Sequence, residues 1–222
     1  YIPPGKAPPG GRPVIAYAHP TSGVVRKCAP SLMPDNAGLI SGLKSMLAKG
    51  YIVVATDYPG LGSPGIHPYL IGKSEGRAVL DSVRAAIALP LSGASNRFVV
   101  WGHSQGGHAA LYAGELAKSY APELKLLGVA AAAPATYLIE LFDADKESAA
   151  GKELTAMAIY SWSKLYGDPA STLVAPNAMN VYKTMAHDCI ESVADFLALD
   201  KAERPHETQK FLKANPAKTQ PW

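Results

Sequence analysis

The chain has 222 residues, of which 48% are hydrophobic and 18% charged, and its formal net charge is +3. This composition is typical of a folded globular domain and excludes a disordered or fibrous chain. Lys and Arg are scattered singly, which argues against nucleic acid or an anionic membrane surface as a partner. The longest apolar run, residues 126–135, is too short to cross a bilayer, and the first residues contain no part of a signal peptide.

The apolar pattern along the first 135 residues predicts alternating strands and helices. A Pro- and Gly-rich segment at 3–13 comes first and is expected to run over the surface. The expected elements, in chain order, are a strand at 14–18, a helix at 37–49, a strand at 51–56, a helix at 72–89, a strand at 97–101, a helix at 108–117 and a strand at 126–132. This repeated βαβ order predicts a doubly wound parallel sheet, and hence an α/β fold.

After residue 135 the pattern changes to helices separated by Pro, Gly or Asp. The expected helices are at 137–142, 149–165, 177–199 and 206–214. We therefore expect an α/β core at 1–135 and a helical cap, or lid, at 136–222. A separate helical domain with another role is the alternative. The cap is favoured because it begins directly after a sheet strand, at the edge where ligand sites form in α/β folds.

The segment Gly102-His103-Ser104-Gln105-Gly106 lies between a predicted strand and a predicted helix. This is the form of a serine nucleophile elbow, with Ser104 as the nucleophile. The glycines are expected because strand and helix approach closely around a strained serine backbone. The pattern alone is a weak signal, and an ordinary Ser in a Gly-rich turn would also match it. The flanking strand and helix favour the catalytic interpretation.

Such a serine performs two-step acyl transfer and needs backbone donors for the tetrahedral oxyanion. One expected donor is the N–H of Gln105, directly after the nucleophile, and the other comes from the loop after the first strand. In that loop Pro20 has no N–H, so Thr21 is the predicted second donor. His19 precedes it and is expected to order the loop. Glu75, in the first turn of a predicted helix, is interpreted as a residue favoured by the helix dipole.

Five further motifs carry a resemblance to a known family. They are YAHPTSG at 17–23, CAPS at 28–31, YIVVATDYPGLG at 51–62, HPYL at 67–70 and EGRAVLD at 75–81. In this order they resemble the secretory lipase family of α/β-hydrolases, typified by fungal lipase A and its bacterial relatives, over about residues 13–135. The resemblance implies an α/β-hydrolase sheet with an inserted helical cap, a carboxylic ester or lipid substrate, and a secreted or periplasmic protein.

The triad acid and base are not identified in the sequence. In this fold they follow the nucleophile, on loops after later sheet strands. The resemblance implies that both lie beyond Trp222, with the last sheet strands, and that early strands precede Tyr1. The chain would then be an interior piece, and a second polypeptide carrying the rest of the fold is compatible with this. The alternative is that residues of the cap serve as the acid and base. This is disfavoured because the candidate residues lie in sequence that is predicted to be helical. These candidates are His187 or His206 as the base and Asp168 or Asp188 as the acid.

Two cysteines, Cys28 and Cys189, have no metal-ligand spacing. From the residues alone, a long-range disulfide and two buried free thiols are equally compatible. The family resemblance favours the disulfide, which also agrees with export. No motif of a metal site or a phosphate-binding loop is present, so no metal and no cofactor are expected.

The sequence thus predicts a serine esterase or lipase, active in lipid degradation through an acyl-enzyme on Ser104. A peptidase, an acyltransferase or a thioesterase could use the same elbow. The alternative from another class is a non-catalytic or incomplete α/β-hydrolase fragment, because without a base only residual catalysis from the oxyanion hole and binding is left.

Overall fold

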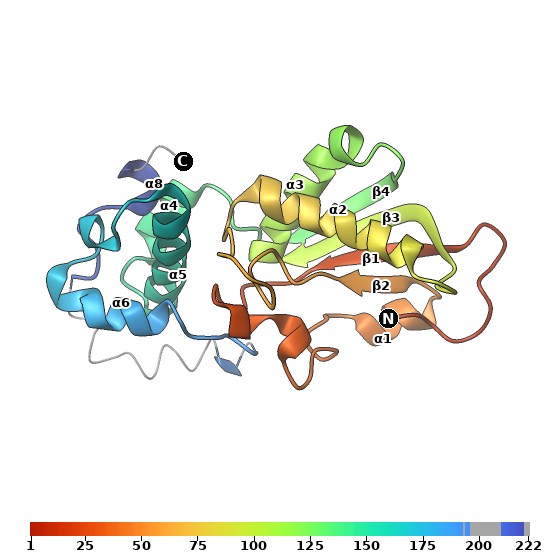
Figure 1. The fold of residues 1–222 in the computed structure, drawn as a ribbon, viewed down its shortest axis with the longest axis horizontal. Coiled ribbons are helices and arrows are strands. Elements are labelled where there is room, and N and C mark those ends of the chain that lie inside the picture. Colours follow the sequence, from red (N-terminus) through yellow and green to blue (C-terminus); the bar gives the residue numbers. More distant parts are fainter. Residues whose placement is uncertain (193, 196–209, 220–222) are drawn as a thin grey trace. The chain divides into compact units, whose positions relative to one another are not determined.

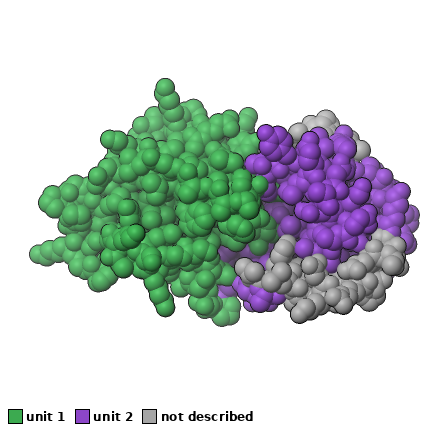
Figure 2. All heavy atoms as spheres, turned by 180° about the vertical axis from the view of Figure 1, so that it is seen from behind, with its two compact units in different colours: residues 1–21, 34–59, 70–134 green, residues 22–33, 60–69, 135–222 purple. Residues whose placement is uncertain are grey.

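The computed structural model describes residues 1–192, 194–195 and 210–219, and the chain divides into two compact units (Figure 2). Unit 1 consists of Tyr1–Thr21, Pro34–Pro59 and Leu70–Pro134. Unit 2 consists of Ser22–Met33, Gly60–Tyr69 and Ala135–Trp222. No helix in the described ranges is long and apolar enough to cross a membrane.

Unit 1 is built on a parallel sheet with the strand order β2-β1-β3-β4 (Figure 1). The strands are β1 (Arg12–Ala18), β2 (Ile52–Ala55), β3 (Ala94–His103) and β4 (Lys125–Ala132). The central strand β1 pairs with both neighbours, Val14 lying beside Ile52 on one side and Phe98 on the other. All five side chains from Val14 to Ala18 are buried, as expected for a strand covered on both faces. The predicted doubly wound parallel sheet is confirmed.

Helices cover both faces of this sheet. They are α1 (Leu43–Ala48), α2 (Gly72–Ala88) and α3 (Gln105–Tyr120), and α2 and α3 lie side by side (Figure 1). Side chains alternate between the faces of a strand. Ile15 and Tyr17 of β1 pack with Leu43 of α1 on one face, which leaves Val14 and Ala16 on the face toward α2 and α3.

The first predicted helix is shorter than expected. Residues 37–42 form turns, and only Leu43–Ala48 of the expected 37–49 is helical. The Asp35 carboxylate accepts a hydrogen bond from the N–H of Gly38 at 2.9 Å, and Gly42 adopts a φ of 84° in the left-handed region. The side-chain hydrogen bond and the left-handed residue both oppose helix in this stretch, although its apolar spacing is helical.

Unit 2 is helical in its C-terminal part. It contains α4 (Leu138–Asp145), α5 (Ala149–Tyr166), α6 (Met179–Met185) and α8 (Pro216–Thr219). Helix α5 begins at an N-cap in which the Ser148 hydroxyl accepts from the N–H of Gly151 at 2.9 Å, and it ends at Gly167 with a φ of 85°. Its buried face packs against α6 and the segment between them, with Ala156, Ile159, Tyr182 and Met185 in one cluster.

Two predicted helices in this unit differ from the structure. One helix is expected at 177–199. Its residues Met179–Met185 form α6, but residues 186–192 are not helical. The N–H of Ile190 donates to the Ser22 carbonyl at 3.0 Å instead of to a carbonyl of the preceding turn. Of the helix expected at 206–214, residues 206–209 lie outside the described residues. Residues 210–214 are not helical, and Leu212 forms an antiparallel bridge with Val174.

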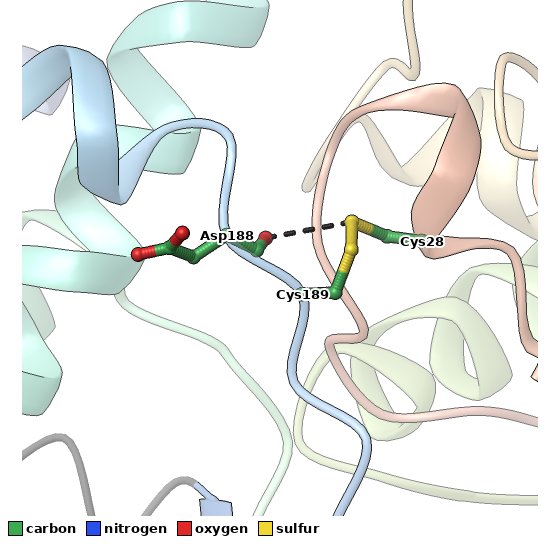
Figure 3. Close-up of a disulfide and its surroundings, with 3 residues drawn as sticks. All are labelled: Cys28, Asp188 and Cys189. Atoms are coloured by element: carbon green, nitrogen blue, oxygen red, sulfur yellow. Dashed lines mark hydrogen bonds between the residues drawn. A yellow bond between two sulfur atoms is a disulfide. The ribbon is translucent and has the colours of Figure 1, made fainter.

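A disulfide joins Cys28 to Cys189 within unit 2, as the family resemblance implied (Figure 3). The bridge spans 161 residues of sequence, and its Cα atoms lie 5.1 Å apart. Cys28 is fully buried, and the carbonyl oxygen of Asp188 lies 3.5 Å from its Sγ. The bridge therefore attaches the segment after β1 to the chain that follows α6.

A second loop is held to α5 by hydrogen bonds. The Ser161 hydroxyl donates to the carbonyl of His67 at 2.6 Å and accepts from the N–H of Tyr69 at 3.0 Å. The indole N–H of Trp162 donates to the carbonyl of Tyr69 at 2.8 Å. All four residues are buried, so these bonds fix the backbone of the segment Gly60–Tyr69 within unit 2.

Candidate active site

Ser104 occupies the junction between β3 and α3. Its backbone has φ 56° and ψ −121°, a conformation that L-residues rarely adopt. The N–H of Ser104 donates to the carbonyl of Ala132 at 3.0 Å, and its own carbonyl accepts from the N–H of His108 at 3.0 Å. These bonds to β4 and α3 hold the strained residue, whose side chain is partly exposed.

The glycines on either side of Ser104 have a steric reason. A Cβ atom on Gly102 would overlap the carbonyl oxygen of Gly106. A Cβ atom on Gly106 would overlap the carbonyl oxygen of Ala18 and lie 2.8 Å from that of His19. The first turn of α3 therefore lies directly against the end of β1, and only glycine permits this approach.

Replacing Gly106 by Ala is expected to lower the free energy of unfolding by about 1–3 kcal/mol, because the methyl group has no space beside the β1 backbone. Chemical denaturation of both proteins measures the difference. The matched control is Gly128→Ala in β4, where an added Cβ meets nothing within 4 Å. An equal loss in both variants would contradict the steric explanation.

Two proposed oxyanion donors come from the same edge of the sheet. Ala18 and Gly102 are partners in adjacent strands, so the chain after each strand begins at the same edge. Gln105 is the first residue of α3, where a backbone N–H has no acceptor within the helix. Thr21 is buried in unit 1, three residues after β1 ends.

His19 lies in the loop after β1 and is buried. Its Nδ1 is 2.7 Å from the carbonyl oxygen of Pro20, and its ring stacks on Tyr58 with 4.3 Å between centroids. The Tyr58 hydroxyl donates to the His19 carbonyl at 3.1 Å. Burial lowers the pKa of His19 to about 4, so the ring is neutral at pH 7 and its Nδ1–H donates to Pro20. These contacts hold the loop in one conformation.

Glu75 is a residue of this region that its sequence position did not reveal. Its side chain is fully buried, and Oε1 accepts from the N–H of Leu70 at 2.9 Å and from Nε2 of Gln105 at 2.7 Å. The second oxygen, Oε2, lies 4.0 Å from Nε2 of His108. Burial raises the pKa of the Glu75 carboxyl to about 8, opposed by the hydrogen bonds from Gln105 and Leu70. The helix dipole accounts for an acid in the first turn, but not for its burial.

The remaining histidines have distinct surroundings. His108 is buried between Glu75 and the ring of Tyr112, whose centroid is 4.8 Å away. His103, the last residue of β3, is exposed. In the described part of unit 1, the two buried histidines thus have different neighbours: His19 contacts Pro20 and Tyr58, and His108 contacts Glu75 and Tyr112.

The cap-borne acid and base candidates belong to unit 2. His187 is exposed at the end of α6, with Nδ1 2.7 Å from the carbonyl oxygen of Lys183 and its ring against Tyr160. Asp168 and Asp188 are partly exposed, and His206 lies outside the described residues. Among the residues described, no group of three or more His, Cys, Asp or Glu side chains could hold a metal ion.

A groove of about 720 Å³ lies elsewhere in unit 1, at the end of β2 and along α2. Ser104 and Gln105 are not among its lining residues. The groove is lined by Thr56, Asp57, Pro59, Ile71, Lys73, Ser74, Arg77, Ala78, Asp81, Ser82 and Ala85.

The parallel sheet with helices on both faces, and a serine at a strand-to-helix turn, define an α/β-hydrolase fold. Solved structures show the same fold. The closed state of Candida antarctica lipase A is 24% identical, with a TM-score of 0.65, and the match covers 83% of this chain and 44% of that one. The rice cell wall degrading esterase LipA from Xanthomonas oryzae is 22% identical, with a TM-score of 0.72, and the match covers 96% of this chain and 59% of that one.

The model of the secretory lipase family matches residues 39–199, and the chain belongs to this family. Lipase 9 of Candida albicans is 36% identical over 117 residues, which are 46% of this chain and 25% of that protein. Lipase A of Moesziomyces aphidis is 37% identical over 82 residues, which are 37% of this chain and 17% of that protein. The chain thus spans at most about a quarter of the length of these two relatives. The predicted family is confirmed.

Proposed function

We propose that the protein is a carboxylic ester hydrolase, an esterase or lipase, and that Ser104 is its nucleophile. The observation that carries this proposal is the backbone of Ser104, held in a strained conformation between β3 and α3 by a hydrogen bond that it donates to β4 and one that it accepts from the helix. Such strain at a partly exposed serine has a purpose when the hydroxyl must be presented to a substrate. Family membership and the names of the related lipases point to ester substrates.

In the proposed reaction, Oγ of Ser104 attacks the carbonyl carbon of the ester while a general base takes the hydroxyl proton. The tetrahedral oxyanion accepts hydrogen bonds from the backbone N–H groups of Gln105 and Thr21. The bond from the carbonyl carbon to the alcohol oxygen then breaks, and the alcohol leaves with the proton. Water, deprotonated by the same base, hydrolyses the acyl-enzyme and restores the serine. His19 contributes by fixing the loop that carries Thr21.

The acid and base of this triad are assigned to sequence beyond Trp222. In unit 1, His19 lies 2.7 Å from the Pro20 carbonyl oxygen and His108 faces Glu75, and the exposed His187 lies 2.7 Å from the carbonyl oxygen of Lys183 in α6. The solved α/β-hydrolases that resemble the chain are longer than it, since the match covers only 44% and 59% of two of them. This extra length is where further strands and their loops would supply both groups.

Unit 2 is proposed to act as the cap. It combines the helical residues after 135 with two loops that follow β1 and β2. Loops at the carboxyl ends of parallel strands surround the ligand site in such folds. Membership of the secretory lipase family, together with a disulfide, also supports a secreted or periplasmic location.

The experiment that tests this function is labelling of the natural full-length protein with a fluorophosphonate, followed by intact-mass and peptide mass spectrometry. A single adduct on Ser104 is expected, because only an activated serine reacts. Ser104→Ala should abolish it, whereas Ser119→Ala, an exposed serine of α3, should leave it unchanged. A folded protein without an adduct would overturn the proposal and favour a non-catalytic fold. If the adduct forms, turnover of ester substrates but not of peptides would distinguish an esterase from a peptidase.

A further inference from the structure

Glu75 connects two strained segments of backbone in unit 1. Leu70 has a φ of 56°, and so does Ser104, the residue before Gln105. One oxygen of the Glu75 carboxyl accepts from the backbone N–H of Leu70 and from the side-chain amide of Gln105. A positive φ at a non-Gly residue persists only where surrounding contacts hold it. The carboxyl is therefore a contact that both segments share.

We propose that Glu75 is a positioning residue for the oxyanion hole, acting through the side chain of Gln105 to hold the first turn of α3 in place. This inference rests on the proposed function, in which the backbone N–H of Gln105 binds the oxyanion. The Gln105 side chain is buried and joined to Glu75 by a 2.7 Å hydrogen bond, so the carboxyl limits movement of that residue. Displacement of a catalytic group by about 1 Å can cost on the order of 100-fold in rate.

The two oxygens of the Glu75 carboxyl have different surroundings. One accepts both hydrogen bonds, and the other lies 4.0 Å from Nε2 of His108. Among the described residues, the titratable side chains near the carboxyl include His108 from α3 and Tyr58 from the loop after β2, whose own pKa is raised mainly by burial and further by Glu75. With the pKa of Glu75 raised to about 8, the group is mostly protonated at neutral pH. A carboxylate at this position would oppose the negative charge that develops on the oxyanion.

The kinetic test compares Glu75→Ala, Glu75→Gln and Glu115→Ala in the natural full-length protein. Glu115 is an exposed residue of α3 and serves as the control for loss of a Glu side chain. Glu75→Ala should lower kcat by about 10- to 100-fold with KM nearly unchanged, because alignment rather than substrate binding is lost. Glu75→Gln should restore most of the rate, since its amide oxygen accepts the same two bonds. The kcat of the wild type is expected to decline as pH rises through about 8, and that of Glu75→Gln is expected to lack this decline.

The outcomes separate this inference from the proposed function. If the wild type reacts with the fluorophosphonate at Ser104 and Glu75→Ala reacts at the same rate, the positioning role is wrong and the function stands. Equal losses in the Ala and Gln variants, with both still folded, would also overturn it. A wild type that neither reacts nor hydrolyses esters would overturn both.

The pH dependence of the free energy of unfolding tests the protonation state of Glu75 without any measurement of catalysis. Its pKa is about 8 when folded, against an ordinary value near 4.5, so the folded protein holds a proton that the unfolded chain releases between these values. The stability that the neutral acid contributes is therefore present below pH 4.5 and is lost as pH rises toward 8. Glu75→Gln should not show this loss, and denaturation at pH 5 and pH 8 measures it. A pH dependence identical to that of the wild type would mean that Glu75 is ionised throughout.

Discussion

Replacing Ser104 by Ala in the natural full-length protein is expected to lower kcat for ester hydrolysis by about 10⁴- to 10⁶-fold. The Oγ atom forms the covalent bond to the acyl group, and no other group replaces it. The free energy of unfolding should hardly change, because Ala keeps the Cβ atom and the backbone hydrogen bonds to Ala132 and His108. Steady-state kinetics and denaturation of the same preparations measure both quantities.

Ser104→Gly is the informative companion to this variant. It should be equally inactive but more stable than Ser104→Ala by about 1–2 kcal/mol, because glycine adopts a φ of 56° and a ψ of −121° without strain. If Ala and Gly have the same stability, the elbow is not strained. If Ser104→Ala retains activity, the nucleophile is another residue and the proposed function is wrong in its central point.

Removal of the Cys28–Cys189 disulfide is expected to destabilise unit 2 by about 2–5 kcal/mol. The bridge closes 161 residues of chain, so the unfolded state gains much conformational freedom when it is absent. The double variant Cys28→Ala with Cys189→Ala avoids placing a polar group at the fully buried Cys28 position. Calorimetry measures the shift, and each transition must be fitted separately if the two units unfold separately.

The reduced wild-type protein is the control for this experiment. Its unfolding temperature should fall close to that of the double variant, because both lack the same bond. A change of less than about 1 kcal/mol in the variant would contradict a stabilising role. If reduction destabilises the protein but the double substitution does not, the free thiols rather than the missing bond would be responsible.

The elements that could be predicted are those whose signal is local. The strands of the sheet appear as short apolar runs, and α2, α3 and α5 appear as apolar residues at helical spacing, because burial repeats along the chain with the period of the element. The nucleophile segment is equally local: Gly102, Ser104 and Gly106 are required by contacts within one strand-to-helix turn and with the strand beside it. Five motifs in order were enough to indicate the family.

Features that depend on distant partners could not be read in this way. Apolar spacing alone predicts a helix through 186–192, but the disulfide to Cys28 and the hydrogen bond from Ile190 to Ser22 hold that segment in another conformation. Glu75 looks like any acid in a first helical turn until Gln105, 30 residues further on, is seen to donate to it. The membership of segment 60–69 in unit 2 rests on bonds to Ser161 and Trp162. Each of these depends on groups from separate parts of the chain, and their meeting is set by packing rather than by any nearby pattern.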